Sequence, residues 1–196
     1  MILFEDGDII VAEKPKGVLS ERGKGENMPD LLSRGGEIFV VHRLDKETRG
    51  LMVFAKNQKA AAALSRQIAS GTFIKKYHAL VEGIPTPQEG EMHDLLFHDR
   101  QKNKTYAVKR ERKGVKRAAL KYKVIMSENG RSLLDITLLT GRTHQIRAQL
   151  SSRQMPLVGD KKYGGGEGEF NLTAYFLKFN HPITGEEMAF SIDTAD

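Results

Sequence analysis

The chain has 196 residues, 39% of them hydrophobic and 29% charged, which is ordinary for one globular domain and excludes wholesale disorder or a fibrous architecture. No apolar run approaches the roughly 18 residues that a membrane span needs. The first eight residues carry three acids, whereas a signal peptide would carry basic residues there. We therefore expect one domain over residues 1–196, located in the cytoplasm.

Cysteine is absent, which excludes disulfides, thiolate metal sites and a cysteine nucleophile. The net charge of +6 is unevenly distributed. Eleven of the 31 Lys and Arg residues, but one of the 25 acids, lie between Arg100 and Lys123, so this segment carries +10 and the rest −4. Such a concentration fits a surface that binds a polyanion. It fits equally well a solvated hairpin whose lysines protect an edge strand.

The first half of the chain alternates between short apolar runs and one helix. Residues 8–13, 38–42 and 50–56 read as strands, which places Asp45 in a strand-to-strand connection. Asn57 is a plausible N-cap for a helix with Ala60, Leu64 and Ile68 on one face, and Gly71 ends it.

Residues 72–82 return to a period of two, which predicts a strand. Its inward face would carry Phe73, Tyr77, Ala79 and Val81. The next predicted strand has a buried and a basic face, and residues 131–140 are its hairpin partner. The buried face of that strand comprises Ala118, Leu120, Tyr122, Val124 and Met126, and the basic face Arg117, Lys121 and Lys123.

Residues 143–153 read as a second helix with Ile146 and Leu150 on its core face. A glycine-rich loop, 159–168, precedes two final strands at 173–179 and 188–192. Many strands with few helices and no regular alternation predict an α+β fold, with a mixed, largely antiparallel sheet and flanking helices.

From the residues alone, the role of Asp45 stays open. It lies between polar neighbours in a loop that follows an apolar strand, where a side chain can be exposed on a rigid base. It could equally be a turn-forming aspartate whose carboxylate caps its own backbone.

Five motifs, in order along nearly the whole chain, resemble those of RluA-like RNA pseudouridine synthases. The central one is His42-Arg43-Leu44-Asp45 with Thr48 and Gly50, followed by an apolar strand. The other four are residues 2–17 (ILFEDGDIIVAEKPKG), 75–83 (KKYHALVEG), 140–147 (TGRTHQIR) and 158–165 (VGDKKYGG).

The resemblance implies a pseudouridine synthase catalytic domain with a central RNA-binding cleft and Asp45 at its floor. It implies that uracil is cleaved from C1′ of its ribose, rotated and rejoined through C5, with no cofactor and no metal. A carboxylate suits this chemistry because it can add covalently or stabilise a glycosidic cation and then leave. The expected partner is RNA, either ribosomal or transfer RNA, and a monomer is the default.

The family also implies roles for two further catalytic residues. Arg147 matches an active-site arginine that should pair with Asp45 and keep it ionised; the alternative is an ordinary exposed helix arginine. Tyr77 matches the tyrosine that packs against the uracil ring and could accept a proton; the alternative is a buried core tyrosine.

Arg43 resembles the arginine that helps to hold the flipped-out nucleotide. Further expected RNA contacts are Arg142, Gln145, Lys109, Arg110, Arg112 and Lys113. Two departures from the family stand out. Arg49 occupies a position where the family usually has serine, and the chain begins without the S4-type domain of many relatives, so we expect the catalytic domain itself to recognise RNA.

The main alternative is a noncatalytic RNA-binding or RNA-chaperone protein with the same fold. Replacement of Asp45, Tyr77 or Arg147 would favour it, and all three match the family. A metal-dependent hydrolase is disfavoured because the six histidines are dispersed and no His-Glu-x-x-His spacing occurs. An NTP-driven RNA enzyme is disfavoured because no phosphate-binding Gly-x-x-x-x-Gly-Lys loop occurs.

Overall fold

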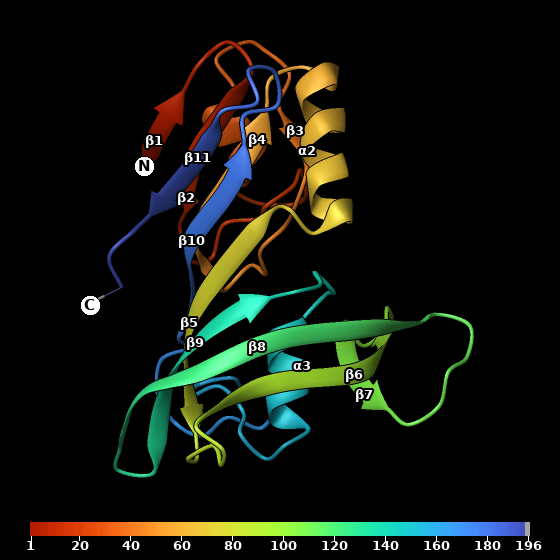
Figure 1. Cartoon of the computed structure of the whole chain (residues 1–196), viewed down its shortest axis with the longest axis vertical. Coiled ribbons are helices and arrows are strands. Elements are labelled where there is room, and N and C mark those ends of the chain that lie inside the picture. The colour runs from red at the N-terminus through yellow and green to blue at the C-terminus, as the bar shows by residue number, and fades with distance from the viewer. Residues whose placement is uncertain (195–196) are drawn as a thin grey trace. The chain divides into compact units, whose positions relative to one another are not determined.

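The computed structural model describes residues 1–194, which form two compact units (Figure 1). The first comprises Met1–Lys75 and the chain from Thr173 onward, and the second comprises Lys76–Leu172. Two strands, β5 (Ile74–Glu82) and β10 (Leu172–Asn180), have residues in both units. One catalytic domain over residues 1–196 stays a prediction.

The sheet of the first unit is mixed. Its strands are β1 (Ile2–Glu5), β2 (Ile9–Lys14), β3 (Phe39–Val40), β4 (Arg49–Ala55), β10 and β11 (Glu187–Ser191). The order is β1-β2-β4-β10, with β3 paired to β4 and β11 to β10. All of these pairs are antiparallel except β4 with β10, which run parallel.

The helix α2 (Gln58–Ser70) packs on β4 and buries Ala60 and Leu64 in an apolar core shared with β2 and β10. Its ends are those predicted: the Asn57 side chain accepts a hydrogen bond from the Ala60 N–H, and Gly71 is left-handed at φ 77°. A short helix, α1 (Met28–Leu32), lies between β2 and β3 and is capped by Asn27.

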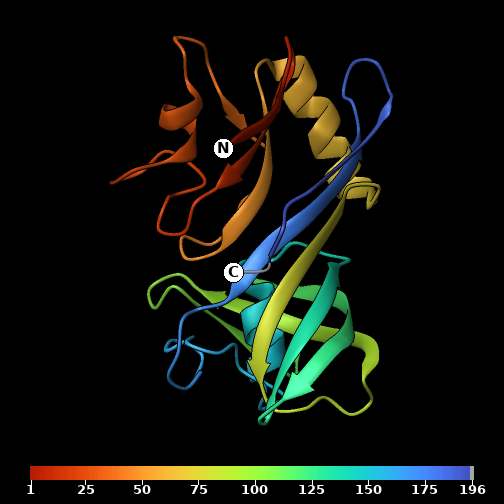
Figure 2. The same ribbon diagram turned by 90° about the vertical axis from the view of Figure 1, so that its left-hand side faces the viewer.

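The second unit holds β5, β6 (Glu89–Asp99), β7 (Lys104–Val108), β8 (Val115–Glu128) and β9 (Arg131–Leu138) in the order β5-β9-β8-β6-β7. The pairs β6–β7, β6–β8 and β8–β9 are antiparallel. The helix α3 (Gln145–Ser151) packs on β6 and β7, and Figure 2 shows the same elements from the side. The predicted mixed, mostly antiparallel α+β fold is confirmed.

Two details of the prediction were wrong. Met126 is 53% exposed rather than buried, because a bulge between Val124 and Met126 shifts the register of β8. The helix predicted over 143–153 is shorter, and residues 145–150 are all buried rather than one face alone. Among the described residues, no helix is long and apolar enough to cross a membrane.

Candidate active site

Asp45 lies on the loop between β3 and β4, and His42 marks where the chain leaves the sheet. β3 pairs with β4 as far as Val40 and Phe54. Beyond that pair, the backbone N–H of Val53 donates instead to His42 Nε2, at 3.1 Å. The imidazole therefore accepts the hydrogen bond that a backbone carbonyl of β3 would accept if the strand continued. The loop is thus anchored at the point where its backbone leaves β4.

The residues on both sides of Asp45 are held by buried side chains. Ser20 Oγ accepts from the Leu44 N–H at 2.9 Å and donates to the Leu44 carbonyl at 2.7 Å. The Lys46 carbonyl accepts from Lys14 Nζ at 3.0 Å and from the Gly17 N–H at 2.9 Å. The Thr48 N–H closes the turn onto the Asp45 carbonyl at 3.0 Å. Asp45 itself is half-buried.

Burial sets the charge states at the base of this loop. Burial, with a smaller contribution from the charge of the nearby Lys75, lowers the pKa of His42 to about 3, so the imidazole is neutral at physiological pH. Burial also lowers the pKa of Lys14 to about 8, and the charges of Glu47 and Asp45 oppose that shift. The Lys14 side chain is fully buried and donates as well to the carbonyls of Pro15 and Val18.

The two arginines near Asp45, Arg43 in the loop and Arg49 at the start of β4, are both ion-paired. Arg43 Nη1 lies 2.6 Å from Glu21 Oε1, and both side chains are 55% exposed. Arg49, the departure from the family pattern, places Nε 2.5 Å from Glu13 Oε1. Because this acid compensates its charge, Arg49 does not add an uncompensated cation beside Asp45. Next to it, Gly50 is required, since a Cβ there would lie 2.3 Å from the Ala174 carbonyl oxygen.

Tyr77 is 4% exposed and lies on the inward face of β5, as predicted. Lys75, two residues earlier, is also buried on this face, and burial lowers its pKa. The sequence pattern gave no signal for a lysine in this position. His78 points to the opposite face of β5, and its partial burial lowers its pKa despite the charge of Asp135.

Arg147 is a buried cation with a buried partner, which excludes the exposed-arginine alternative. Its side chain is 9% exposed, and its Nε and Nη2 lie 2.7 and 2.8 Å from the two carboxylate oxygens of Asp160. The guanidinium carbon lies 4.8 Å from the Tyr163 ring centre and 5.3 Å from that of Phe170. Asp160 belongs to the motif at residues 158–165, but the sequence did not indicate that it pairs with Arg147.

Gln145 and Arg142 shape the turn before α3. Gln145 is buried, its Oε1 accepts from Thr140 Oγ1 and the Arg142 N–H at 2.7 and 2.9 Å, and its Nε2 donates to the Ala119 carbonyl. Arg142 is exposed and donates through Nε to the Arg117 carbonyl at 3.0 Å. Gln145 therefore holds the turn that presents Arg142, an indirect role that the sequence did not indicate.

The predicted basic hairpin is divided in two. In β8, Lys121 pairs with Glu91 and Lys123 lies 3.8 Å from Glu89, so acids on β6 compensate this face. The loop between β7 and β8 (Figure 1) carries four of the expected RNA contacts, and all four residues are exposed. These are Lys109, Arg110, Arg112 and Lys113. Arg112 lies over the Phe97 ring at 4.9 Å.

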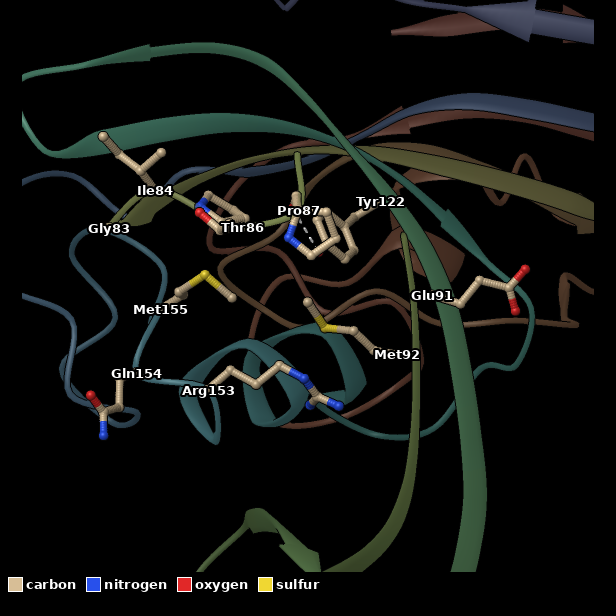
Figure 3. Close-up of a pocket in the computed structure, with 11 residues that line it drawn as sticks. Gly83, Ile84, Thr86, Pro87, Glu91, Met92, Tyr122, Arg153, Gln154 and Met155 are labelled. Carbon is tan, nitrogen blue, oxygen red and sulfur yellow. Dashed lines mark hydrogen bonds between the residues drawn. The ribbon is translucent and has the colours of Figure 1, made fainter. Parts of the chain in front are cut away.

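A pocket of about 570 Å³ lies within the second unit, at the ends of β5 and α3 (Figure 3). Figure 3 shows Met92, Met155 and the Arg153 guanidinium around it, with Tyr122 donating to the Pro87 carbonyl at 3.0 Å. The Arg153 charge is taken up by Asp94 at 2.8 Å. The residues expected to act in catalysis do not line this pocket.

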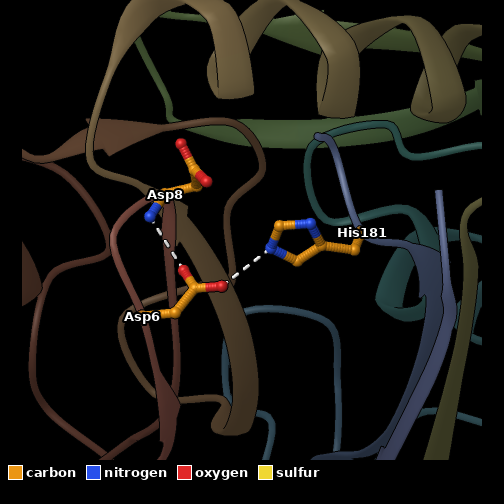
Figure 4. A group of neighbouring side chains, drawn as sticks. All are labelled: Asp6, Asp8 and His181. Carbon is orange, nitrogen blue, oxygen red and sulfur yellow. Dashed lines mark hydrogen bonds and ion pairs between the residues drawn. The ribbon is translucent and has the colours of Figure 1, made fainter. Parts of the chain in front are cut away.

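Asp6, Asp8 and His181 form a cluster with the spacing of a metal site (Figure 4). Its hydrogen bonds favour another role. Nδ1 of His181 accepts from the Ile183 and Thr184 N–H groups, so Nε2 carries the hydrogen and donates to Asp6 Oδ2 at 2.8 Å. Both imidazole nitrogens are therefore engaged, and the cluster ties the first turn of the chain to the β10–β11 hairpin.

The chain is similar in sequence and in structure to known RNA pseudouridine synthases. A family model described as RNA pseudouridylate synthase matches residues 8–152. The ribosomal large subunit pseudouridine synthase D of Vibrio cholerae is 35% identical over all of this chain and 67% of its own length. An uncharacterized RNA pseudouridine synthase of Bacillus subtilis, YlyB, is 33% identical over 96% of this chain and 67% of its own. The chain thus spans about two thirds of these relatives.

Among solved structures, the human protein RNA pseudouridylate synthase domain containing 4 aligns with a TM-score of 0.81. The alignment covers 98% of this chain and 87% of the human one at 24% identity, so it supports the fold. Within this chain, Asp45 and Arg43 belong to the first unit, while Tyr77, Arg142 and Arg147 belong to the second.

Proposed function

This chain belongs to the RluA-like family of RNA pseudouridine synthases, and we propose that it isomerises specific uridines of a structured ribosomal or transfer RNA with Asp45 as the catalytic carboxylate. The observation that carries the role of Asp45 is the way its loop is built. Buried side chains hold the residues before and after it, while Asp45 is half-buried. A rigid loop that fixes the backbone on both sides of a carboxylate is what nucleophilic catalysis requires.

The reaction balances without an oxidant, a reductant or net hydrolysis. The N1–C1′ bond breaks, a C5–C1′ bond forms, the C5 hydrogen leaves as a proton and N1 gains one. The carboxylate of Asp45 adds to an electrophilic carbon or stabilises the glycosidic cation, and is released when the new bond forms. The family places the reaction on a nucleotide extruded from its stack, which costs a few kcal/mol that protein contacts must offset.

Tyr77 and Arg147 are proposed as its catalytic partners. The inward position of Tyr77 on β5 supports packing against the uracil ring and acceptance of a proton. The bidentate contact with Asp160 gives Arg147 a fixed orientation, which supports a role in pairing with a carboxylate. In this proposal, Asp160 positions Arg147.

RNA binding is assigned to exposed cations. Arg43, Arg142 and the loop between β7 and β8 would contact phosphates, and Gln145 would act through the turn that it holds. The RNA-binding cleft with Asp45 at its floor, a monomeric state and a cytoplasmic location complete the proposal. A noncatalytic RNA-binding protein is disfavoured because all three catalytic residues match the family.

The test is tritium release from RNA labelled at uridine C5, taken as total RNA from a strain that lacks the protein. Isomerisation expels that hydrogen, so the wild type should release tritium and Asp45→Ala should not. Sequencing of the modified RNA then locates the uridine and decides between ribosomal and transfer RNA. If neither protein releases tritium although both are folded and bind RNA tightly, the noncatalytic alternative is correct.

A further inference from the structure

The geometry points to Ser20 as a residue that positions Asp45, an inference that rests on the proposed role of Asp45 in catalysis. The Ser20 hydroxyl makes two hydrogen bonds to the backbone of one residue, Leu44. A hydroxyl can donate once and accept, and here both capacities serve the residue directly before the carboxylate. Ser20 is 4% exposed and Leu44 is 7% exposed, so this contact is shielded from solvent.

The two peptide planes that flank Asp45 are fixed from different sides. The carbonyl of Leu44 belongs to the Leu44–Asp45 peptide, and Ser20 Oγ holds it at 2.7 Å. The carbonyl of Asp45 belongs to the next peptide, and the Thr48 N–H holds it at 3.0 Å. Because peptide units are planar, fixing both planes restricts φ and ψ of Asp45, and therefore the direction in which its carboxylate leaves the backbone.

Ser20 is itself held on a firm base. The N–H of Leu19 donates to the Glu26 carbonyl, and the N–H of Met28 donates back to the Leu19 carbonyl, at 2.9 and 2.8 Å. Asn27 then caps α1 through the Asp30 N–H at 3.0 Å. The segment that carries Ser20 is thus tied to a capped helix, so movement of the Ser20 hydroxyl would have to disturb these bonds.

Loss of the hydroxyl should affect turnover more than RNA binding. Ser20→Ala removes both bonds and leaves the buried N–H and carbonyl of Leu44 without their partner, which frees the Leu44–Asp45 peptide to rotate. Misplacement of a reacting group by about 1 Å can cost roughly 100-fold in rate. Arg142 and the cations of the loop between β7 and β8 lie far from this change in the sequence, and of the cations proposed to bind RNA only Arg43 adjoins the altered peptide.

The experiment compares kcat for tritium release and Kd for RNA in the wild type, Ser20→Ala and a matched control, Ser132→Ala. Ser132 is also buried, at 1% exposure, and donates to a backbone carbonyl, that of Gly83, but it lies on β9. Both variants should lose comparable stability in urea. Ser20→Ala should lower kcat by about 10- to 100-fold with Kd within about twofold, whereas Ser132→Ala should keep both.

An unchanged kcat in folded Ser20→Ala would overturn the inference, as would an equal fall in kcat for Ser132→Ala. If Ser20→Ala does not fold, Ser20→Cys replaces it, because the thiol keeps a weaker and longer hydrogen-bonding group. Ser20→Cys should lower kcat by less than the roughly 10- to 100-fold expected for Ser20→Ala, with Kd retained. An unchanged kcat in Ser20→Cys would likewise overturn the inference. Absence of tritium release by the wild type would instead refute the proposed function.

Discussion

The ammonium of Lys14 lies 3.0 Å from the carbonyl oxygen of Lys46, the residue that follows Asp45. A fully buried charged group therefore links the loop that carries Asp45 to the end of β2. Burial lowers the pKa of this lysine to about 8 from 10.5 in the unfolded chain. Because Lys14 is buried beside the loop that carries Asp45, the unfolding free energy should depend on pH where this lysine titrates.

We predict that the unfolding free energy of the wild type, relative to Lys14→Met, rises with pH between about 8 and 10.5. In this window the unfolded chain binds the proton of Lys14 and the folded chain does not, so the cost of burying the charge is relieved. The rise should be about 2–3 kcal/mol, the amount that a pKa difference of this size implies across the window. Urea unfolding of both proteins from pH 7 to 10.5 measures it. Parallel curves would contradict the assignment.

Asp160→Asn should destabilise the protein by about 3 kcal/mol, because it leaves Arg147 buried without its carboxylate. Glu82→Gln is the matched control, since it removes the acid from a more exposed, partly buried pair with Arg131 and should cost about 1 kcal/mol. Denaturant unfolding gives both values. Equal losses for the two variants would show that burial of the Arg147–Asp160 pair is not decisive.

Asp160→Asn should also lower kcat, since Arg147 loses the group that orients it. The double variant Arg147→Met with Asp160→Asn should be less destabilised than the sum of the single changes, because neither charge is then left buried alone. Additive losses would instead indicate that the two residues act independently.

Features with local signals could be predicted from the sequence. The capped ends of α2 and the period of two in β5 depend on neighbouring residues, so Asn57, Gly71 and the inward position of Tyr77 follow from pattern alone. β6 could not be recognised in this way. Its most buried apolar residues, Met92 and Leu96, are four apart, which resembles a helix, and its strand form depends on pairing with β7 and β8.

The supports of the candidate site depend on contacts between distant residues. Ser20 and Leu44 are 24 residues apart, and Lys14 and Lys46 are 32 apart. Resemblance to a family indicated Asp45 and Arg147, but it did not indicate the hydrogen bonds that Lys14 and Ser20 make to the backbone of the Asp45 loop. From the sequence alone, Ser20 and Lys14 would be predicted to be exposed. Their burial depends on backbone carbonyls that only the folded chain brings close to them.

Acid should weaken the protein through His42. Burial holds its folded-state pKa at about 3, against 6.5 in the unfolded chain, so the unfolded state gains a proton first as pH falls. Relative to His42→Gln, whose amide can still accept from the Val53 N–H, the wild type should lose about 3 kcal/mol between pH 7 and pH 4. Urea unfolding at several pH values tests this. Identical pH slopes for the two proteins would exclude His42 as the cause.

Glu21→Gln should strengthen RNA binding if Arg43 contacts a phosphate. The acid now pairs with Arg43 at 2.6 Å and competes with RNA for the guanidinium. Its removal should lower Kd two- to threefold and steepen the dependence of log K on log salt by about 0.7, the value for one phosphate on a single strand. Fluorescence anisotropy with a labelled stem-loop provides both numbers. No change in either would mean that Arg43 does not contact phosphate in the complex.

The role of the loop between β7 and β8 in RNA binding can be tested by comparison with lysines of β8 that are already paired with acids. Lys109→Gln with Arg110→Gln removes two exposed cations from the loop, whereas Lys121→Gln with Lys123→Gln removes two cations that face Glu91 and Glu89 on β6. Each double variant changes the net charge equally, so long-range attraction is matched. Only the loop variant should raise Kd about tenfold and reduce the salt slope by about 1.4, because paired lysines release few RNA counterions.

Equal effects of the two double variants would mean that RNA responds to total charge rather than to the loop. An unchanged Kd and salt slope for the loop variant would remove the loop from the RNA-binding surface. In that case Arg43 and Arg142 would have to supply the phosphate contacts. Arg142→Gln, which removes the exposed cation and its Nε contact with the Arg117 carbonyl, should then lower RNA affinity more than the loop variant does.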